Sequence, residues 1–166
     1  MAEKTYFGMV LSGGGIKIID VVPTLTVHAT YVANDYVGTN NVAMTFADAA
    51  RVLAGSGIVI AAELVDYVVA SVAAELWLFD TAPAGLGLDS AAFTITDADA
   101  ARCIGVVPFS TYYASALNSV SPVGNLTLGF TCLAGSQNIY GALVTRGAPA
   151  YAASGDVRVR LHIMQC

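Results

Sequence analysis

Two aspartates one residue apart, in the stretch FTITDADAARCIGVVPF, are the first candidates for chemistry in this sequence. Asp97 and Asp99, with Asp89 upstream, could hold a divalent cation through their carboxylates. A calcium loop needs more oxygen ligands at alternating positions and a glycine in the bend, which DADAARC lacks. A short turn fits better: Thr96 or Asp97 would cap its free N–H groups, Asp99 would lie near the positive end of the dipole, and Arg102 near the negative end. We therefore predict a capped turn, without a metal.

Hydrolytic chemistry finds little support in the residue pattern. No Gly-x-Ser-x-Gly elbow occurs, and His28 and His162 fall on the polar faces of expected strands. SGGGIK has neither the spacing of a phosphate loop nor a Ser or Thr after Lys17. Four carboxylates could supply a glycosidase acid and base, but no pattern brings two of them together: Glu63, Asp66, Glu75 and Asp80. We expect no catalytic residues, no metal and no cofactor.

Three further groups of side chains each allow two interpretations. Cys103, Cys132 and Cys166 are odd in number and lack a CxxC pair, which favours free, buried thiols over a zinc or redox role. The alternating Arg158, Arg160 and His162 form either a solvated strand face or a ladder for an acidic partner. Four tyrosines could line a sugar site or the rim of a subunit interface: Tyr112, Tyr113, Tyr140 and Tyr151.

We expect strands to position these residues, because apolar and polar residues alternate along much of the chain with a period of two. DVRVRLHIMQ alternates fully, and TLTVHATYV and NLTLGFTCL repeat the pattern. Continuous apolar runs of strand length are IKIIDVV, GIVIAAELVDYVV, AAELWLFD, CIGVVPF and NIYGALV. Clusters of Gly, Pro, Asn, Asp and Ser separate them, among them ANDYVGTNN and NSVSPVGN. The pattern predicts an all-β antiparallel two-sheet sandwich of jelly-roll type, with eight to ten strands and little helix.

The chain is expected to form a single domain over residues 15–166, after a flexible N-terminal arm at residues 1–14 that is marked by SGGG at residues 12–15. Residues 45–55, TFADAARVLAG, allow either a helix or a strand that ends in a loop. Pro108 fits an edge strand or the end of a strand.

The composition combines 56% hydrophobic with only 11% charged residues. A membrane span is not expected, because the longest apolar stretch, residues 58–79, contains Glu63, Asp66 and Glu75. The apolar run near the N-terminus is too short for the core of a signal peptide, so we expect the chain to remain in the cytoplasm in which it is made. A net charge of −5 disfavours direct binding to nucleic acid. So few charges indicate that other chains cover much of the surface.

Blocks of the sequence resemble a family of small structural proteins of tailed bacteriophages, the capsid decoration or cement proteins. The blocks are AAELWLFD, SAAFTITDADAARCIGVVPF and IYGALVTRGAPAYAASGDVRVRLHIMQ, with FADAARVLAGSGIV as an N-terminal block. The resemblance covers about residues 24–165. It implies a jelly-roll sandwich that forms homotrimers on the outside of the virion head, binds the major capsid protein and stabilises the shell. It carries over no functional residue.

The expected function is therefore that of a non-enzymatic virion structural protein on the capsid exterior. A phage tail or baseplate component is an alternative, because only the resemblance points to the head. A carbohydrate-binding module is a second alternative, since sandwich folds also include many lectins.

Overall fold

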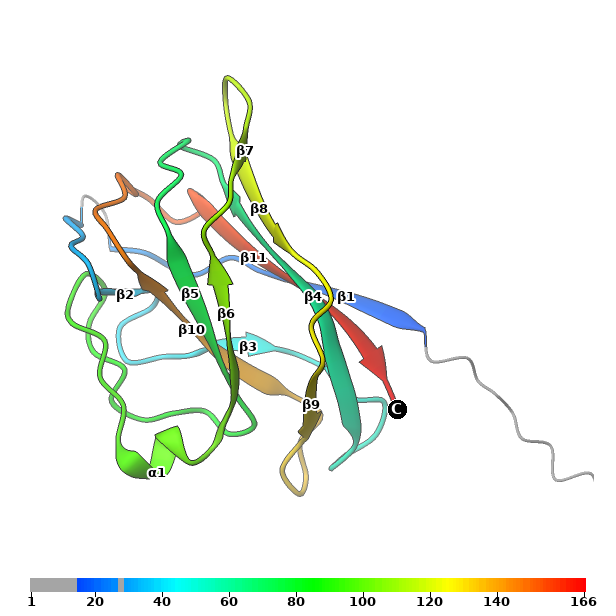
Figure 1. Ribbon diagram of the computed structural model, residues 1–166. Coiled ribbons are helices and arrows are strands. Elements are labelled where there is room, and N and C mark those ends of the chain that lie inside the picture. Colours follow the sequence, from blue (N-terminus) through cyan, green and yellow to red (C-terminus); the bar gives the residue numbers. More distant parts are fainter. Residues whose placement is uncertain (1–14, 27–28) are drawn as a thin grey trace, which may run out of the picture.

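The computed structural model describes residues 15–26 and 29–166, and nearly all of the regular secondary structure in these residues is strand (Figure 1). One sheet contains β1 (Ile16–Val21), β4 (Ser56–Asp66), β7 (Tyr113–Ala114), β8 (Ser119–Val123), β9 (Leu128–Thr131) and β11 (Val157–Gln165). The other contains β2 (Tyr36–Val37), β3 (Met44–Phe46), β5 (Ala74–Phe79), β6 (Cys103–Phe109) and β10 (Ile139–Thr145). The helix α1 (Asp97–Ala100) precedes β6.

The strand pairs are nested, as in a hairpin folded over on itself. β1 pairs with β11, β2 and β3 lie end to end along β10, β8 and β9 lie end to end along β4, and β5 pairs with β6. All of these pairs are antiparallel. Further ladders, β11 with β4 and β10 with β5, join them into a six-stranded and a five-stranded sheet. This is the order of a jelly roll, and the predicted all-β two-sheet sandwich is confirmed. The described residues form eleven strands, more than the predicted eight to ten, because two-residue strands such as β2 and β7 pair along longer neighbours.

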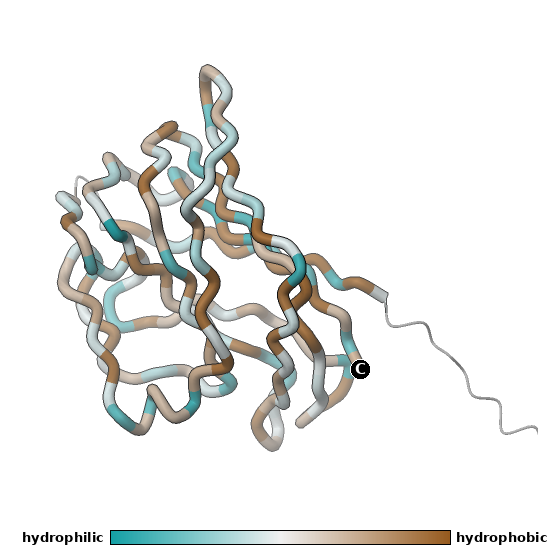
Figure 2. Tube along the Cα trace, in the orientation of Figure 1, coloured by the Kyte–Doolittle hydropathy of each residue, from teal (hydrophilic) through white to brown (hydrophobic). Residues whose placement is uncertain are grey.

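The core lies between the two sheets and follows from the alternation of the strands. In β11 every second side chain from Val157 to Ile163 is fully buried, and the side chains between them are half-buried or exposed on the outer face. The opposite sheet contributes large side chains to the same layer, including Phe46, Leu76 and Phe109. Hydrophobic segments accordingly run along the strands of both sheets in Figure 2. Burial of this apolar layer drives the folding of the sandwich.

The outer face of the five-stranded sheet carries a second, smaller apolar cluster. The connection from β5 to β6, residues 80–102, returns across this face and buries Leu86. Trp77 packs against Phe93 of this connection with ring centroids 5.4 Å apart. The chain thus covers one of its two outer sheet faces with its own residues.

Most of the expected strands lie within one or two residues of those observed. Residues 103–109 match β6, and Pro108 lies on the edge strand of its sheet, as predicted. The ambiguous residues 45–55 begin in the strand β3 and continue as a loop. The predicted arm at residues 1–14 and His28 lie outside the described residues.

Three expectations about local structure were wrong. ANDYVGTNN, expected to separate strands, contains β2, which pairs with β10. TLTVHATYV forms no strand in the residues described, because side chains bind its backbone instead of a neighbouring strand: the N–H of Leu25 donates to Ser154 Oγ at 2.9 Å and that of Thr26 to Asp89. NSVSPVGN, expected to be a turn, contains β8, whose residues pair with β4. Pairing with a long neighbouring strand overrides the local preference of a segment rich in Ser and Pro.

Candidate functional site

The two aspartates one residue apart belong to a capping box. Thr96 Oγ1 accepts a hydrogen bond from the N–H of Asp99 at 3.1 Å, and its hydroxyl donates to Asp99 Oδ2 at 2.8 Å. The bond with Thr96 lowers the pKa of Asp99. Arg102 lies beyond the helix, with Nε 2.8 Å from Asp80 Oδ1. The predicted capped turn is confirmed, and Asp99 and Arg102 both have structural partners within the chain.

Asp89, the third carboxylate of the candidate cation site, has a separate role. It is buried, and its two oxygens accept hydrogen bonds from Tyr31 Oη at 2.7 Å, from the N–H of Gly38 at 3.2 Å and from the N–H of Thr26. The carboxylate therefore holds together three segments of the chain. Across residues 15–26 and 29–166, no group of three or more His, Cys, Asp or Glu side chains is placed to hold a metal ion.

The four carboxylates weighed as a glycosidase pair have separate environments. Asp66 is buried at the end of β4 and accepts hydrogen bonds from the N–H groups of Val68 and Ser71, whereas Glu63 faces outward from the same strand. Glu75 lies on the other sheet, where its hydrogen bond with Arg146 lowers its pKa. Asp80 pairs with the arginine after α1. The structure assembles no acid and base from them.

The ladder on β11 meets acidic partners within the chain itself. Arg160 Nε and Nη2 donate to the two oxygens of Asp20 at 2.7 and 3.1 Å, and its Nη1 lies 3.3 Å from Glu63 Oε2. His162 Nε2 lies 3.5 Å from Glu63 Oε1. Arg158 lies over the ring of Tyr67, 5.9 Å from its centroid. We call Asp20, Glu63, Arg158, Arg160 and His162 the outer ion row. Because β1 and β4 supply the acidic partners, the predicted ladder is neither a purely solvated strand face nor a surface left open for an acidic partner.

Asp20 is the residue that sequence reasoning missed in this row. The hydrogen bond with Arg160 lowers the pKa of Asp20. The available signal was a lone aspartate in the middle of the apolar run IKIIDVV, but only the pairing of β1 with β11 shows which arginine it faces.

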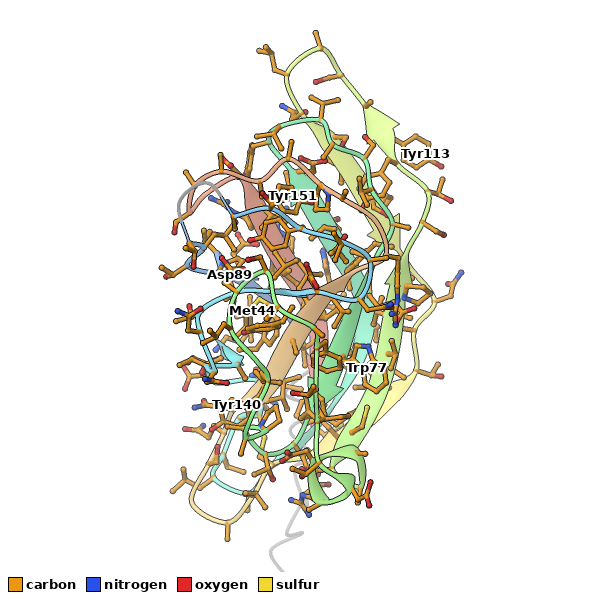
Figure 3. The ribbon with its side chains drawn as sticks, turned by 90° about the vertical axis from the view of Figure 1, so that its left-hand side faces the viewer. Met44, Trp77, Asp89, Tyr113, Tyr140 and Tyr151 are labelled. Atoms are coloured by element: carbon orange, nitrogen blue, oxygen red, sulfur yellow. The ribbon has the colours of Figure 1, made fainter. Side chains whose placement is uncertain are left out.

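The four tyrosines considered for a sugar site do not converge. Tyr151 is buried in the core, where its ring meets Tyr31 edge-on with centroids 5.9 Å apart, and Tyr112 donates its hydroxyl to the carbonyl of Val72 at 2.6 Å. Tyr140 packs in the second cluster. Tyr113 alone among the four is largely exposed, and Figure 3 shows it apart from Tyr140 and Tyr151. A stacking platform made of these rings is absent from the described structure.

Buried tyrosines give the protein a predictable response to alkali. Burial raises the pKa of four phenols above the usual value of about 10: Tyr31, Tyr36, Tyr112 and Tyr151. Since the folded-state pKa is the higher one, their contribution to stability is complete below about pH 10 and is lost as the pH rises beyond it. In a titration followed at 295 nm, at least four of the eight tyrosines should ionise only together with unfolding. Smooth, reversible ionisation of all eight in a folded chain would contradict this.

All three cysteines are free thiols, but they do not share one environment. Cys132 is buried and Cys103 is half-buried, and burial raises the pKa of both thiols. Cys166 is exposed, so the expectation of burial holds for only part of the set. The two raised pKa values disfavour the reactive thiolate form at those positions.

Comparison with known proteins adds no relative to these observations. No protein-family model, no curated protein and no solved structure matches the chain. Among the described residues, no helix has the length and apolar character required to cross a membrane.

Proposed function

We propose that the chain is a non-enzymatic structural subunit of a tailed-bacteriophage head, a decoration protein that associates with copies of itself and binds the major capsid protein. The observation that carries the proposal is the outward-facing apolar surface of the six-stranded sheet, where Ile16 is 59% and Ile18 54% exposed. Strands with one solvated face normally place polar residues outward. An assembly would cover these side chains, as a structural subunit requires.

The chemistry of the described residues supports the same proposal. Their carboxylates serve caps, buried turns and ion pairs, and no nucleophile, base and orienting group come together. A jelly roll is compatible with capsid and lectin functions alike, so the fold alone favours neither. The dispersed tyrosines disfavour the lectin alternative. The sequence blocks that resemble decoration proteins favour the head over the tail.

Binding through many modest contacts is the mechanism that we propose. A homotrimer presents three capsid-binding surfaces at once, so that each contact after the first forms at a high effective concentration. Such avidity strengthens binding by a factor of about 10² to 10⁴ over that of a single subunit.

An addition experiment tests the proposed function. Purified protein is incubated with phage heads that lack it, and the heads are then sedimented and heated. We expect it to sediment with the heads, near saturation at a fixed ratio to the capsid protein, and to raise the temperature at which the heads release DNA. Isolated tails serve as the matched control.

The contrary outcomes are distinct. Binding to tails in place of heads would replace the proposal by the tail alternative, and labelled antibodies on whole particles would give the same answer. Binding to neither, together with specific hits on a glycan array, would favour a carbohydrate-binding module.

A further inference from the structure

We propose that the outer face of the six-stranded sheet packs against a second copy of this chain. This inference names the surface used in the proposed function and rests on the self-association assumed there. The outer sheet face, as we use the term, consists of the outward-pointing side chains of β1, β11, β4, β8 and β7. Figure 2 shows hydrophobic segments along β1, which extends beyond one side of the sandwich.

Strand register shows that the apolar residues of this face are contiguous. Ile16 of β1 lies opposite Met164 of β11, which lies opposite Ile58 of β4. All three point outward, and Ile18 extends the group in the next outward row, where it faces His162. Neighbouring side chains in such a row are about 5 Å apart, so they form one patch and not scattered exposed residues.

A second apolar row crosses the opposite end of the face. Val65 of β4 lies opposite Val120 of β8, which in turn lies opposite Tyr113 of β7. The Tyr113 side chain is 69% exposed and projects from the edge of the sandwich (Figure 3). The outer ion row separates the two patches, because Asp20, Arg160 and Glu63 lie opposite one another across three strands.

The other sheet shows how this chain treats an apolar outer face. There the connection of residues 80–102 buries Leu86 and packs Phe93 on Trp77. The described chain places no such segment over Ile16, Ile18 and Met164, which remain exposed. The chain covers the apolar outer face of the five-stranded sheet but leaves that of the six-stranded sheet exposed. We therefore infer that another chain covers this second face.

Charge favours a second copy as the occupant. The outer ion row contains two acids, Asp20 and Glu63, and two arginines, Arg158 and Arg160, so this face has no net charge when His162 is neutral. The whole chain carries −5, so the acidic excess lies elsewhere. Two copies of an acidic protein repel each other least where their surfaces are neutral, whereas a basic partner would bind the acidic surfaces instead.

The edge of β1 is a less suitable contact than the face. Lys17, between the two outward isoleucines, points inward and its Nζ lies 3.6 Å from Asp48 Oδ2. An inward-pointing charge on an edge strand is a known protection against pairing with a further strand. The copies are therefore expected to meet through side chains and not through added strand hydrogen bonds.

Mass measurement on face variants tests this inference. The full chain is compared by light scattering with Ile18→Glu and with Met164→Glu, each of which adds a carboxylate to a face that is neutral in the parent when His162 is neutral. We expect the parent to form a dimer or a trimer and either variant to dissociate at least 100-fold more readily, because a buried, unpaired charge at an interface is strongly unfavourable. Val42→Glu, at a position 55% exposed and outside this face, is the matched control and should keep the parent mass.

Separate measurements test whether the variants fold and which molecule covers the outer sheet face. Each monomeric variant should have the same far-UV circular dichroism spectrum and thermal midpoint as the parent diluted until it is monomeric. Tyr113→Ala, at the other end of the face, should weaken self-association at least tenfold. An oligomeric parent whose mass survives all three face substitutions overturns the inference but leaves the head proposal standing. A monomeric parent also overturns it, and loss of head binding by the face variants would then identify the capsid as the occupant. If the parent is an oligomer that does not bind phage heads, and the face variants are monomers, the inference is supported and the proposed function is refuted.

Discussion

Replacement of Asp89 by alanine should lower the free energy of unfolding by about 4 kcal/mol, which is a large part of the stability of a domain of this size. The carboxylate is buried and accepts hydrogen bonds from two backbone N–H groups and from the hydroxyl of Tyr31. The alanine variant leaves these three donors without their acceptor in a region that water reaches poorly. Each hydrogen bond to a charged group contributes about 1.5–3 kcal/mol. Urea denaturation at neutral pH measures the change.

Matched variants separate the carboxylate from its neighbours. Tyr31→Phe removes one hydroxyl and should cost about 1–2 kcal/mol, and Asp89→Asn should fall between Tyr31→Phe and the alanine variant. Because Asp89 does not join Asp97 and Asp99 in a cation site, calcium or EDTA should leave the unfolding midpoint of the parent unchanged. A midpoint raised by calcium and lowered by Asp97→Asn would show that the capping interpretation is incomplete.

Phe46→Ala should destabilise the protein by about 3–5 kcal/mol, because it empties a fully enclosed site in the core. The ring lies between the sheets, over Gly141 of β10, the neighbouring strand of the same sheet. A Cβ built on Gly141 would come within 2.8 Å of Phe46 Cε2 and 3.1 Å of Leu76 Cδ1. The phenyl ring thus occupies the space that the glycine leaves, and equilibrium unfolding in urea measures its contribution.

A double-mutant cycle tests that arrangement. Gly141→Ala alone should cost about 1–3 kcal/mol through overpacking against the ring. In the Phe46→Ala background the 2.8 Å contact with the ring is gone and the 3.1 Å contact with Leu76 Cδ1 remains, so the same substitution should cost clearly less there. Equal costs in both backgrounds would mean that the ring and the glycine do not share one volume.

The sequence determined the elements with strong periodicity. The alternation of DVRVRLHIMQ predicted β11 and its buried face, because side chains of successive strand residues point to opposite sides. The residues around Thr96 predicted a capped turn, because a cap and the N–H groups that it binds lie within four residues; the structure selects Thr96 over Asp97 as the cap and adds the return bond to Asp99. These features depend on neighbours in the chain, and a single sequence contains that information.

Several segments and all distant contacts depended on the tertiary structure. Residues 119–123 form a strand because β4 offers them a partner, and residues 24–26 do not, because Asp89 and Ser154 take their N–H groups. Asp20 and Arg160 are 140 residues apart in the chain and meet only through the β1–β11 ladder.

The sequence by itself determined a sandwich of strands with a shortage of charge, since composition and periodicity are local properties that survive any rearrangement of the strands. Only the tertiary structure decided which apolar faces the chain buries. Alternation shows that a strand has two sides, but the nested strand pairs and the course of residues 80–102 select the sides that remain exposed. The uncovered face around Ile16 and Ile18 therefore follows from topology, because the letters of β1 are equally compatible with burial on both sides.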